Sequence, residues 1–363
     1  MSEKQHPSPK FLYRKQNSVM PTIRDVARMC GVSPMTVSFV LNNKPGQVSE
    51  ETREKVLKAV REMDYHPAAS EHKARDRQVL TLGLVAGVEG HSLMQPGYYQ
   101  AIANGVLTAA DQLSHNITFF TNSIFHNEPR KSLRVYCDGR CDGLMVLAPR
   151  LGSTLVAALH ERGIPFVLIG DTGDKETISC VDIDNVQEGY QVTEYLILQG
   201  HRRIAFVGGP EFVRSSSQRH KGYCQALTAH GIPLPSDSIL MNNVRPAETG
   251  SRIQHMMQVS RMERPTAIFG WNDGAAVQTL HVVQTLGLNV PGDVSIIGID
   301  DDITATTVNP PLTTVRQPYE AIGRQVLDIL VDHIRGKNTT SQRKFLPAEL
   351  IERASVAPPR DRG

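Results

Sequence analysis

Residues 22–48 read TIRDVARMCGVSPMTVSFVLNNKPGQV, and this stretch decides the fold of the amino-terminal part of the chain. Thr22 stands where a helix N-cap belongs, with Asp25 three residues later as its capping-box partner. Gly31 supplies the backbone freedom for a tight turn, and Ser33 is placed to cap a second helix. The stretch therefore predicts two short helices joined by a turn.

The second predicted helix runs from residue 34 to about residue 41 and has one apolar side. Val37, Val40 and Leu41 recur at helical spacing and form the stripe that we expect to be buried. A helix face that points away from its own core can enter the major groove of DNA. The residues expected on that outer face are Pro34, Met35, Thr36, Ser38 and Phe39.

A third helix is expected after Ser49, which is placed to cap it, with Glu50 and Glu51 in its positive first turn. Its apolar stripe consists of Val56, Ala59, Val60 and Met63. Three short helices make one small domain, which we expect to span residues 21–66. Any small three-helix bundle has caps, a glycine turn and apolar stripes, so this spacing alone favours DNA binding only weakly.

Two segments of this domain resemble a known family. The segments VARMCGVSPMTVSFVLN and VSEETREKVLKAVREMDYHP are similar to the amino-terminal domain of the lactose/galactose repressor (LacI/GalR) family of bacterial transcription regulators. The resemblance implies a helix-turn-helix unit that binds double-stranded DNA at a pseudo-palindromic operator. It also implies phosphate-positioning roles for Thr22, Thr36, Ser38 and Asn42.

The chain departs from the family pattern on the outer face of the second helix. Family members often carry an arginine where this chain has Phe39. Phenylalanine cannot make a bidentate contact to guanine, but it can pack on the methyl group of thymine. Apolar readout of bases by Met35 and Phe39 is therefore expected.

A second departure lies in the linker that we expect over residues 67–78. In the resembled family this linker forms a hinge helix on DNA, and a leucine from each copy enters the minor groove. Ala74 occupies the leucine position here, and Glu71 replaces a small alanine, so the usual kinking of the operator is in doubt. Lys73 and Arg75 remain as phosphate contacts. A flexible tether is the alternative interpretation.

Charge is distributed unevenly along the chain. Residues 1–78 hold fourteen Lys and Arg against nine Asp and Glu, while the remaining residues hold twenty-five against twenty-eight. The basic end is therefore the end expected to bind DNA. Residues 1–20 are expected to be a disordered basic tail, and Met20 is an alternative start. The first twenty residues lack the apolar stretch of a secretory signal, which favours a cytoplasmic protein with reduced thiols.

From residue 79 to residue 355 short apolar runs alternate with amphipathic stretches. Such alternation predicts an α/β fold with parallel sheets covered by helices on both faces. The pattern restarts after Asp184, which predicts two lobes with a ligand cleft at the carboxyl ends of the strands. Residues 356–363 are expected to be a disordered tail.

This region also resembles the LacI/GalR family. The segments VDIDNVQEGYQVTEYLILQGHRRIAFVGG, GWNDGAAVQTL, LNVPGDVSIIGIDD and PPLTTVRQPYEAIGRQVLDIL look like successive signatures of its effector domain, which is similar to periplasmic sugar-binding proteins. The resemblance implies that Arg219, Asn272 and Asp300 bind a small effector. A guanidinium, an amide and a carboxylate together suit a polyhydroxylated molecule such as a sugar.

Further residues are candidates for the same cleft. Asp171 ends an apolar run, and Tyr98, Tyr99 and Trp271 offer aromatic faces on which a sugar can rest. Arg245 falls where relatives often carry an aromatic ring, and a second arginine would favour an anionic ligand such as an acidic sugar. Asp273 is expected to cap the next helix.

Catalysis, a metal site and a cofactor find no support in the sequence. No nucleophile elbow, dinucleotide fingerprint or phosphate-binding loop is present. The favoured function is an effector-controlled transcription regulator that acts as a repressor. A homodimer is expected, because one recognition helix reads too few bases. The alternatives are a solute-binding protein and a sugar-modifying α/β enzyme with a DNA-binding appendage.

Overall fold

The structure is a computed structural model of the chain. It describes residues 22–41, 46–63, 65, 78–86, 97–120, 129–171, 173, 176–235, 246–260 and 262–360. The chain divides into two compact units, residues 1–68 and residues 69–363. Each unit has its own core and is described by itself.

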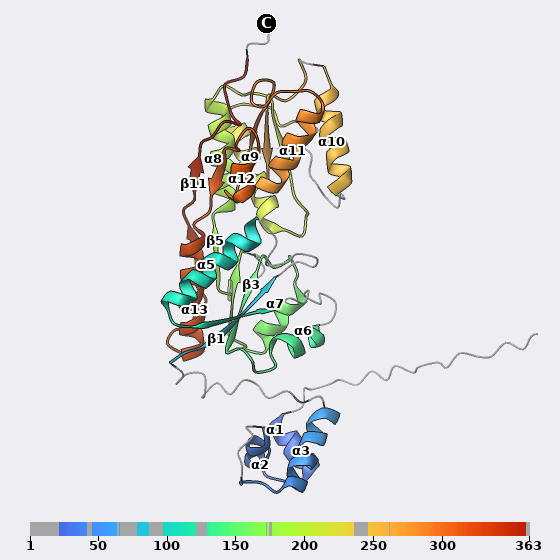
Figure 1. The fold of residues 1–363 in the computed structure, drawn as a ribbon, viewed down its shortest axis with the longest axis vertical. Coiled ribbons are helices and arrows are strands. Elements are labelled where there is room, and N and C mark those ends of the chain that lie inside the picture. Colours follow the sequence, from blue (N-terminus) through green and yellow to red (C-terminus); the bar gives the residue numbers. More distant parts are fainter. Residues whose placement is uncertain are drawn as a thin grey trace, which may run out of the picture. The chain divides into compact units, whose positions relative to one another are not determined.

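The described residues of the small unit form three helices (Figure 1). These are α1 (Ile23–Cys30), α2 (Pro34–Leu41) and α3 (Glu50–Glu62). Thr22 and Asp25 form the predicted capping box, Gly31 ends α1 in the left-handed conformation with φ 64°, and Ser49 caps α3. The sequence therefore predicted the helices and their caps correctly, because each signal acts within a few residues.

The core of the small unit is made by one face of each helix. Val37 and Val40 of α2 pack there with residues of α1 and α3 and with Tyr65. Leu41, which the sequence placed in the buried stripe, is only half-buried. The outer face of α2 is exposed at Pro34 and Met35, where Met35 is 65% exposed.

The large unit contains two α/β lobes. Lobe 1 consists of residues 80–183 and 319–346, and its six-stranded sheet has the order β10-β5-β4-β3-β1-β2. Every pairing in this sheet is parallel. The strands are β1 (Thr81–Ala86), β2 (Asn116–Phe120), β3 (Gly143–Leu147), β4 (Phe166–Ile169), β5 (Cys180–Ile183) and β10 (Arg343–Leu346).

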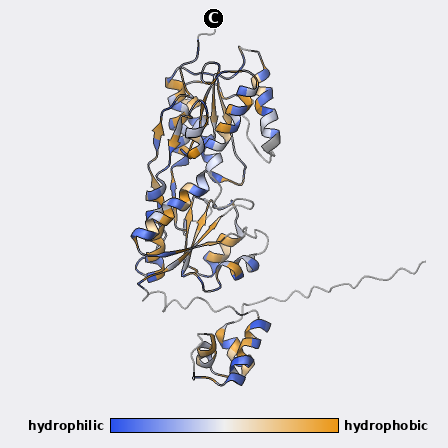
Figure 2. Cartoon of the chain, viewed as in Figure 1, coloured by the Kyte–Doolittle hydropathy of each residue, from blue (hydrophilic) through white to orange (hydrophobic). Residues whose placement is uncertain are grey.

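Helices cover both faces of the lobe 1 sheet, as the apolar strands require. On one face lie α5 (Tyr98–Gln112) and α13 (Tyr319–Arg335), which contact each other where Gly105 meets the backbone of Tyr319. On the other face lie α6 (Pro129–Tyr136) and α7 (Thr154–Glu161). Figure 2 shows the apolar residues concentrated in the strands between these helix layers.

Lobe 2 consists of residues 184–317 and 348–357. Its parallel sheet has the order β6-β7-β8, formed by β6 (Ile204–Val207), β7 (Ala267–Gly270) and β8 (Ser295–Ile297). The helices α8 (Asn185–Leu198) and α9 (Arg214–Ala229) cover one face. The helices α10 (Pro246–Gln258) and α11 (Asp273–Thr285) cover the other face.

The remaining elements connect the lobes or extend lobe 2. They are α12 (Ile303–Thr307) and the antiparallel pair β9 (Thr314–Arg316) and β11 (Glu349–Ile351). The chain passes between the lobes after β5, between β9 and α13, and between β10 and β11. Lobe 1 is thus completed by a segment from near the carboxyl end, whereas the sequence pattern had suggested two consecutive runs.

The ordered chain continues beyond residue 355, where the sequence places the start of an unfolded tail. Val356 packs against the lobe 2 core. The amide of Ala357 donates to Ser295 Oγ at 3.1 Å, and the Ala357 carbonyl oxygen lies 3.0 Å from His201 Nε2. Residues 356 and 357 therefore belong to the body of lobe 2.

Candidate ligand-binding site

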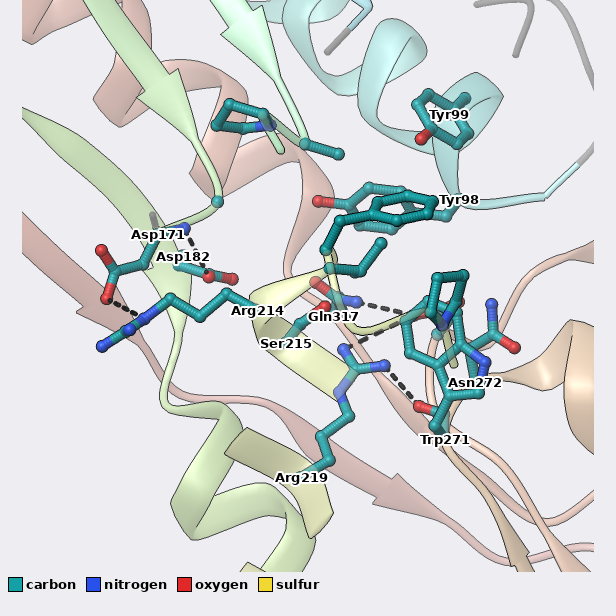
Figure 3. A pocket seen from close by; sticks show the side chains of 17 residues that line it. Tyr98, Tyr99, Asp171, Asp182, Arg214, Ser215, Arg219, Trp271, Asn272 and Gln317 are labelled. Atoms are coloured by element: carbon teal, nitrogen blue, oxygen red, sulfur yellow. Dashed lines mark hydrogen bonds and ion pairs between the residues drawn. The ribbon is translucent and has the colours of Figure 1, made fainter. Parts of the chain in front are cut away.

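A cavity of about 210 Å³ lies between the two lobes of the large unit (Figure 3). A cavity needs only about 10–15 Å³ of such space to hold one water, so a small ligand fits. Its polar walls come from the carboxyl ends of parallel strands, where open α/β sheets place ligands. The lining residues are Tyr98, Tyr99, Ala148, Pro149, Gly170, Asp171, Asp182, Pro210, Phe212, Val213, Arg214, Ser215, Arg219, Trp271, Asn272, Asp300 and Gln317.

Arg219 on α9 is buried at the floor of this cavity, with 3% of its surface exposed. Its Nε donates to Asn185 Oδ1 at 2.9 Å, and its Nη1 donates to the carbonyl oxygen of Trp271 at 2.6 Å. Its Nη2 lies 3.9 Å from Asp300 Oδ1. Two of the three guanidinium nitrogens thus fix the group in place, while Nη2 faces the cavity carboxylate.

Asp300 follows β8 and has an unusual backbone conformation. Its φ is 143° and that of Asp301 is 54°, both in a region that residues other than glycine rarely adopt. Gln317 Nε2 donates to Asp300 Oδ1 at 2.7 Å, and the Tyr319 hydroxyl donates to the Asp300 carbonyl oxygen at 2.6 Å. These bonds hold the strained turn and aim the carboxyl group at the cavity. Burial raises the pKa of Asp300 to about 7.

Asp182 is a second buried carboxyl group of the cavity, and the sequence analysis did not single it out. It accepts hydrogen bonds from Asn185 Nδ2 at 3.1 Å and from the amide of Asp171 at 3.1 Å. Burial raises its pKa to about 6. The VDID segment carried a signal for this residue. Successive side chains of a strand point to opposite faces of the sheet, so an aspartate within an apolar strand needs polar partners on its face.

Asp171 lines the cavity as expected, but its carboxylate faces two arginines. Arg343 Nη2 lies 2.7 Å from Oδ1, and Arg214 Nε lies 3.4 Å from Oδ2. The amide of Gly173 also donates to Oδ1 at 2.7 Å. Neither arginine was singled out in the sequence, because each is more than 40 residues away from Asp171 along the chain.

Asn272 lines the cavity as expected, but it is Asn272 and not Asp273 that caps α11. Asn272 lines the cavity and is also the N-cap of α11, since its Oδ1 accepts from the amide of Ala275 at 2.9 Å. Asp273 is fully buried and accepts from Thr314 Oγ1 at 2.5 Å and from the amide of Asp302 at 3.1 Å. The expectation that Asp273 caps the helix was therefore wrong, because its side chain points into lobe 2.

Aromatic rings form the apolar walls. Tyr98 and Tyr99 of α5 pack edge to face with ring centres 5.8 Å apart, and Tyr98 contacts Tyr319 in the same way. Burial, reinforced by the charges of Asp182 and Asp300, raises the pKa of Tyr98 well above its ordinary value, so this hydroxyl stays protonated. Trp271 lies against Gly209 from lobe 2, where a Cβ would come within 2.4 Å of the indole.

Several predicted site residues lie outside the described residues. These are Asn42, Glu71, Lys73, Ala74, Arg75 and Arg245. On α2, Pro34 and Met35 are exposed, while Thr36, Ser38 and Phe39 are half-buried. Ser33 Oγ accepts from the amide of Thr36 at 3.1 Å and so caps this helix.

Two features are not found in the parts of the chain that the structure describes. Among these residues no cluster of histidine, cysteine, aspartate and glutamate is arranged to hold a metal ion. None of the described helices combines the length and apolar character needed to cross a membrane.

Comparison with known proteins gives the family. A model of the bacterial regulatory proteins of the lacI family matches residues 22–68, and a model of the periplasmic binding protein-like domain matches residues 193–356. The chain is 33% identical to the HTH-type transcriptional repressor PurR of Erwinia tasmaniensis over 342 residues, which are 93% of this chain and 97% of that protein. The chain belongs to the LacI family.

Other members of the LacI family are similar over the same length. The HTH-type transcriptional regulator CelR of Thermobifida fusca is 32% identical over 92% of this chain and 98% of its own. The solved CelR–cellobiose complex is 31% identical with a TM-score of 0.70, covering 93% of this chain and all of that chain. The lac repressor dimer bound to operator and the anti-inducer ONPF is 26% identical with a TM-score of 0.63, covering 93% and 99%.

Family membership fixes the coarse function. This LacI-family protein is a DNA-binding transcription regulator with a periplasmic binding protein-like effector domain, as the sequence analysis predicted. Regulators of the LacI family bind operator DNA and small effectors, and they are not enzymes.

Proposed function

We propose that this LacI-family regulator is a repressor whose operator affinity is controlled by a small neutral sugar or sugar derivative bound in the cavity between the lobes. The observation that carries the proposal is the combination of buried hydrogen-bonding groups with aromatic walls in that cavity. Arg219, Asn272 and Asp300 serve vicinal hydroxyls, and Tyr99 and Trp271 contact the faces of the ring.

The charges around the cavity favour a neutral ligand over the acidic sugar that Arg245 would suit. Three carboxyl groups line the cavity, those of Asp171, Asp182 and Asp300, against the guanidinium groups of Arg214 and Arg219. Arg214 is engaged by Asp171, and Arg219 already makes two hydrogen bonds within the protein. Among the described lining residues, a carboxylate ligand would therefore find no arginine that is free of a hydrogen bond or ion pair within the protein. Likeness to the CelR–cellobiose complex also supports a carbohydrate.

For DNA binding we propose a homodimer in which each copy presents α2 to one half-site of a pseudo-palindromic operator. Residues 21–66 are the DNA-binding domain in this proposal, residues 67–78 the linker and residues 79–355 the effector domain. Thr22, Pro34, Met35, Thr36, Ser38, Phe39, Asn42, Lys73 and Arg75 are the proposed DNA contacts. The relative named as the lac repressor dimer bound to operator supports this assembly.

The experiment that tests the proposal uses the single tryptophan of the chain, Trp271, which lines the cavity. Its fluorescence is titrated with glucose, galactose, cellobiose and galacturonate, and each sugar is also added to the protein bound to randomised palindromic DNA. We expect a neutral sugar to change both the emission and the affinity for DNA. A response to galacturonate alone would overturn the neutral-ligand assignment. Failure to bind any duplex at low ionic strength would overturn the proposal as a whole.

A further inference from the structure

Beside the cavity, residues 210–214 of lobe 2 contact lobe 1 directly. The Arg150 guanidinium, which follows β3, lies over the Phe212 ring with its carbon 3.7 Å from the ring centre. The amide of the next residue, Leu151, donates to the Phe212 carbonyl oxygen at 3.1 Å. A stacked cation and a backbone hydrogen bond thus join the same residue of lobe 2 to consecutive residues of lobe 1.

A third contact lies two residues further along lobe 2, at the first residue of α9. Arg214 Nε is 3.4 Å from Asp171 Oδ2, and the other carboxylate oxygen of Asp171 pairs with Arg343 of lobe 1. The guanidinium of Arg214 lies on Gly173, where a Cβ would come within 2.1 Å of its central carbon. Only a residue without a side chain leaves room for the guanidinium at this point. Figure 3 shows Arg214 reaching across to Asp171.

These contacts differ from those that hold each lobe together. The apolar cores of lobe 1 and lobe 2 form separate clusters, so parting the lobes at this edge exposes no core. Arg214 Nε is buried but lacks hydrogen-bond geometry to a partner among the described residues. The contact is therefore polar and imperfectly satisfied, so separating Arg214 from Asp171 breaks no well-formed hydrogen bond of this nitrogen.

We infer that Phe212 and Arg214 form a latch that closes over the ligand cavity by docking on Arg150, Leu151 and Asp171. This inference concerns the regulation of the cavity in the proposed function. Phe212, Arg214 and Asp171 line the cavity, so the latch closes directly over a bound ligand. The latch sets the ratio of open to closed protein. The closed form is the one that binds ligand tightly, so a latch that raises the fraction of closed protein raises the apparent affinity for the ligand.

Arg150 gives the sharpest test, because it holds Phe212 and does not itself line the cavity. Arg150→Ala therefore removes the stacking of Arg150 on Phe212, which stabilises the closed form, without removing a contact to the ligand. The measurement is acrylamide quenching of Trp271 fluorescence in the full-length protein without added sugar. We expect the open-to-closed ratio to rise about tenfold, equivalent to about 1.4 kcal/mol, and quenching to rise with it.

Arg140→Ala is the matched control. Arg140 also lies over an aromatic ring, that of Phe120 at 5.4 Å, but both residues belong to lobe 1. It should leave the quenching of Trp271 unchanged. If Arg150→Ala lowers the melting temperature strongly, Arg150→Lys serves in its place, because lysine keeps the charge but loses the planar stack on Phe212.

A second readout separates the latch from ligand contact. With cellobiose, glucose and galactose as probes, Arg150→Ala should weaken every sugar that binds by the same factor, mainly through faster dissociation. Unchanged quenching in both Arg150 variants, or a factor that differs from sugar to sugar, would overturn the latch. The quenching result needs no ligand, so a lack of response to all sugars contradicts the proposed function and leaves the latch test standing.

Discussion

Helix α2 and the ligand cavity place their recognition chemistry in opposite surroundings. On α2, Met35 is 65% exposed and Pro34 is exposed as well. In the cavity, Arg219 and Asp300 are each 3% exposed and already bonded within the protein. Surface changes usually cost little stability, whereas breaking a buried polar network costs several kcal/mol. Substitutions on the outer face of α2 can therefore change DNA recognition at little cost to stability. Substitutions of the buried cavity residues change ligand recognition and stability together.

The strongest test of this difference is Arg219→Ala. It leaves the carboxyl group of Asp300, the amide of Asn185 and a backbone carbonyl without their buried partner. We expect the free energy of unfolding of the large unit to fall by about 3–5 kcal/mol, and the response of Trp271 fluorescence to sugar to vanish. Urea denaturation followed by circular dichroism measures the first effect.

The control for this variant is Arg324→Ala, which removes an exposed arginine paired with Asp328 on α13. Its effect should stay within about 0.5 kcal/mol. If Arg219→Ala unfolds at the same urea concentration as the wild type, the buried network does not support the fold.

The next largest effect is expected where α9 crosses α8, because this crossing sets the position of Arg219. A Cβ on Gly222 would come within 2.0 Å of the Val186 carbonyl oxygen. Gly222→Ala should therefore destabilise the large unit by about 1–3 kcal/mol through overpacking. It should also weaken sugar binding, measured by the same fluorescence titration.

Gly250 on α10 offers a matched control for the glycine substitution. A Cβ there would meet only Val282 Cγ2 at 3.8 Å. Gly250→Ala should stabilise the protein by about 0.5–1 kcal/mol, because alanine is the better helix former. Equal melting temperatures for the two alanine variants would contradict the close crossing of α8 and α9.

On α2, Phe39→Arg should change recognition at little cost to stability, because Phe39 is half-buried and lies outside the core of the small unit. Arginine can bond to guanine where phenylalanine packs on a thymine methyl, so preference at one half-site position should shift toward guanine by about 1–3 kcal/mol. Selection from randomised operators measures the preference. Phe39→Leu keeps an apolar side chain and should retain the original base, and an unchanged preference in Phe39→Arg would contradict the proposed docking of α2.

The effect of pH is the smallest when it is counted per pH unit. Burial raises the pKa of Asp300 from its usual 3.8 to about 7, so the folded protein holds a proton that the unfolded chain has already released. The free energy of unfolding should therefore fall as the pH rises from about 4 to about 7, with a contribution on the order of 1 kcal/mol per pH unit. Asp300→Asn should reduce this slope, to which the raised pKa of Asp182 also contributes, in denaturation series between pH 4 and pH 7.

Asp328→Asn is the control for the pH series, because Asp328 lies exposed on α13. Its slope should match that of the wild type. A slope in Asp300→Asn as steep as in the wild type would show that the proton is held elsewhere.

Local signals explain what the sequence predicted well. The capping box at Thr22, the left-handed turn at Gly31 and the strand-helix alternation each depend on neighbouring residues, and the structure has all of them. The family resemblance, rather than a local signal, pointed to Arg219, Asn272 and Asp300, and the structure brings these three residues together at one cavity.

Contacts between distant residues explain what the sequence did not predict. The pairing of β10 with β5 joins segments some 160 residues apart along the chain. The spacing of apolar residues predicts that each segment is a strand, but it does not predict which strand lies beside it. Likewise, the engagement of Asp171 by Arg214 and Arg343 depends on how the two lobes meet. Asp182 lies inside a strand rather than after one, so a search of strand ends passed over it.

The late completion of lobe 1 has a consequence for synthesis of the protein. Helix α13 covers one face of the lobe 1 sheet and β10 forms its edge, but both leave the ribosome after nearly all of lobe 2. During translation at ~5–20 residues per second, the apolar face of β1, β3 and β4 waits about ten seconds or more for its cover. A nascent chain in this interval is the natural client of a chaperone that shields apolar surfaces.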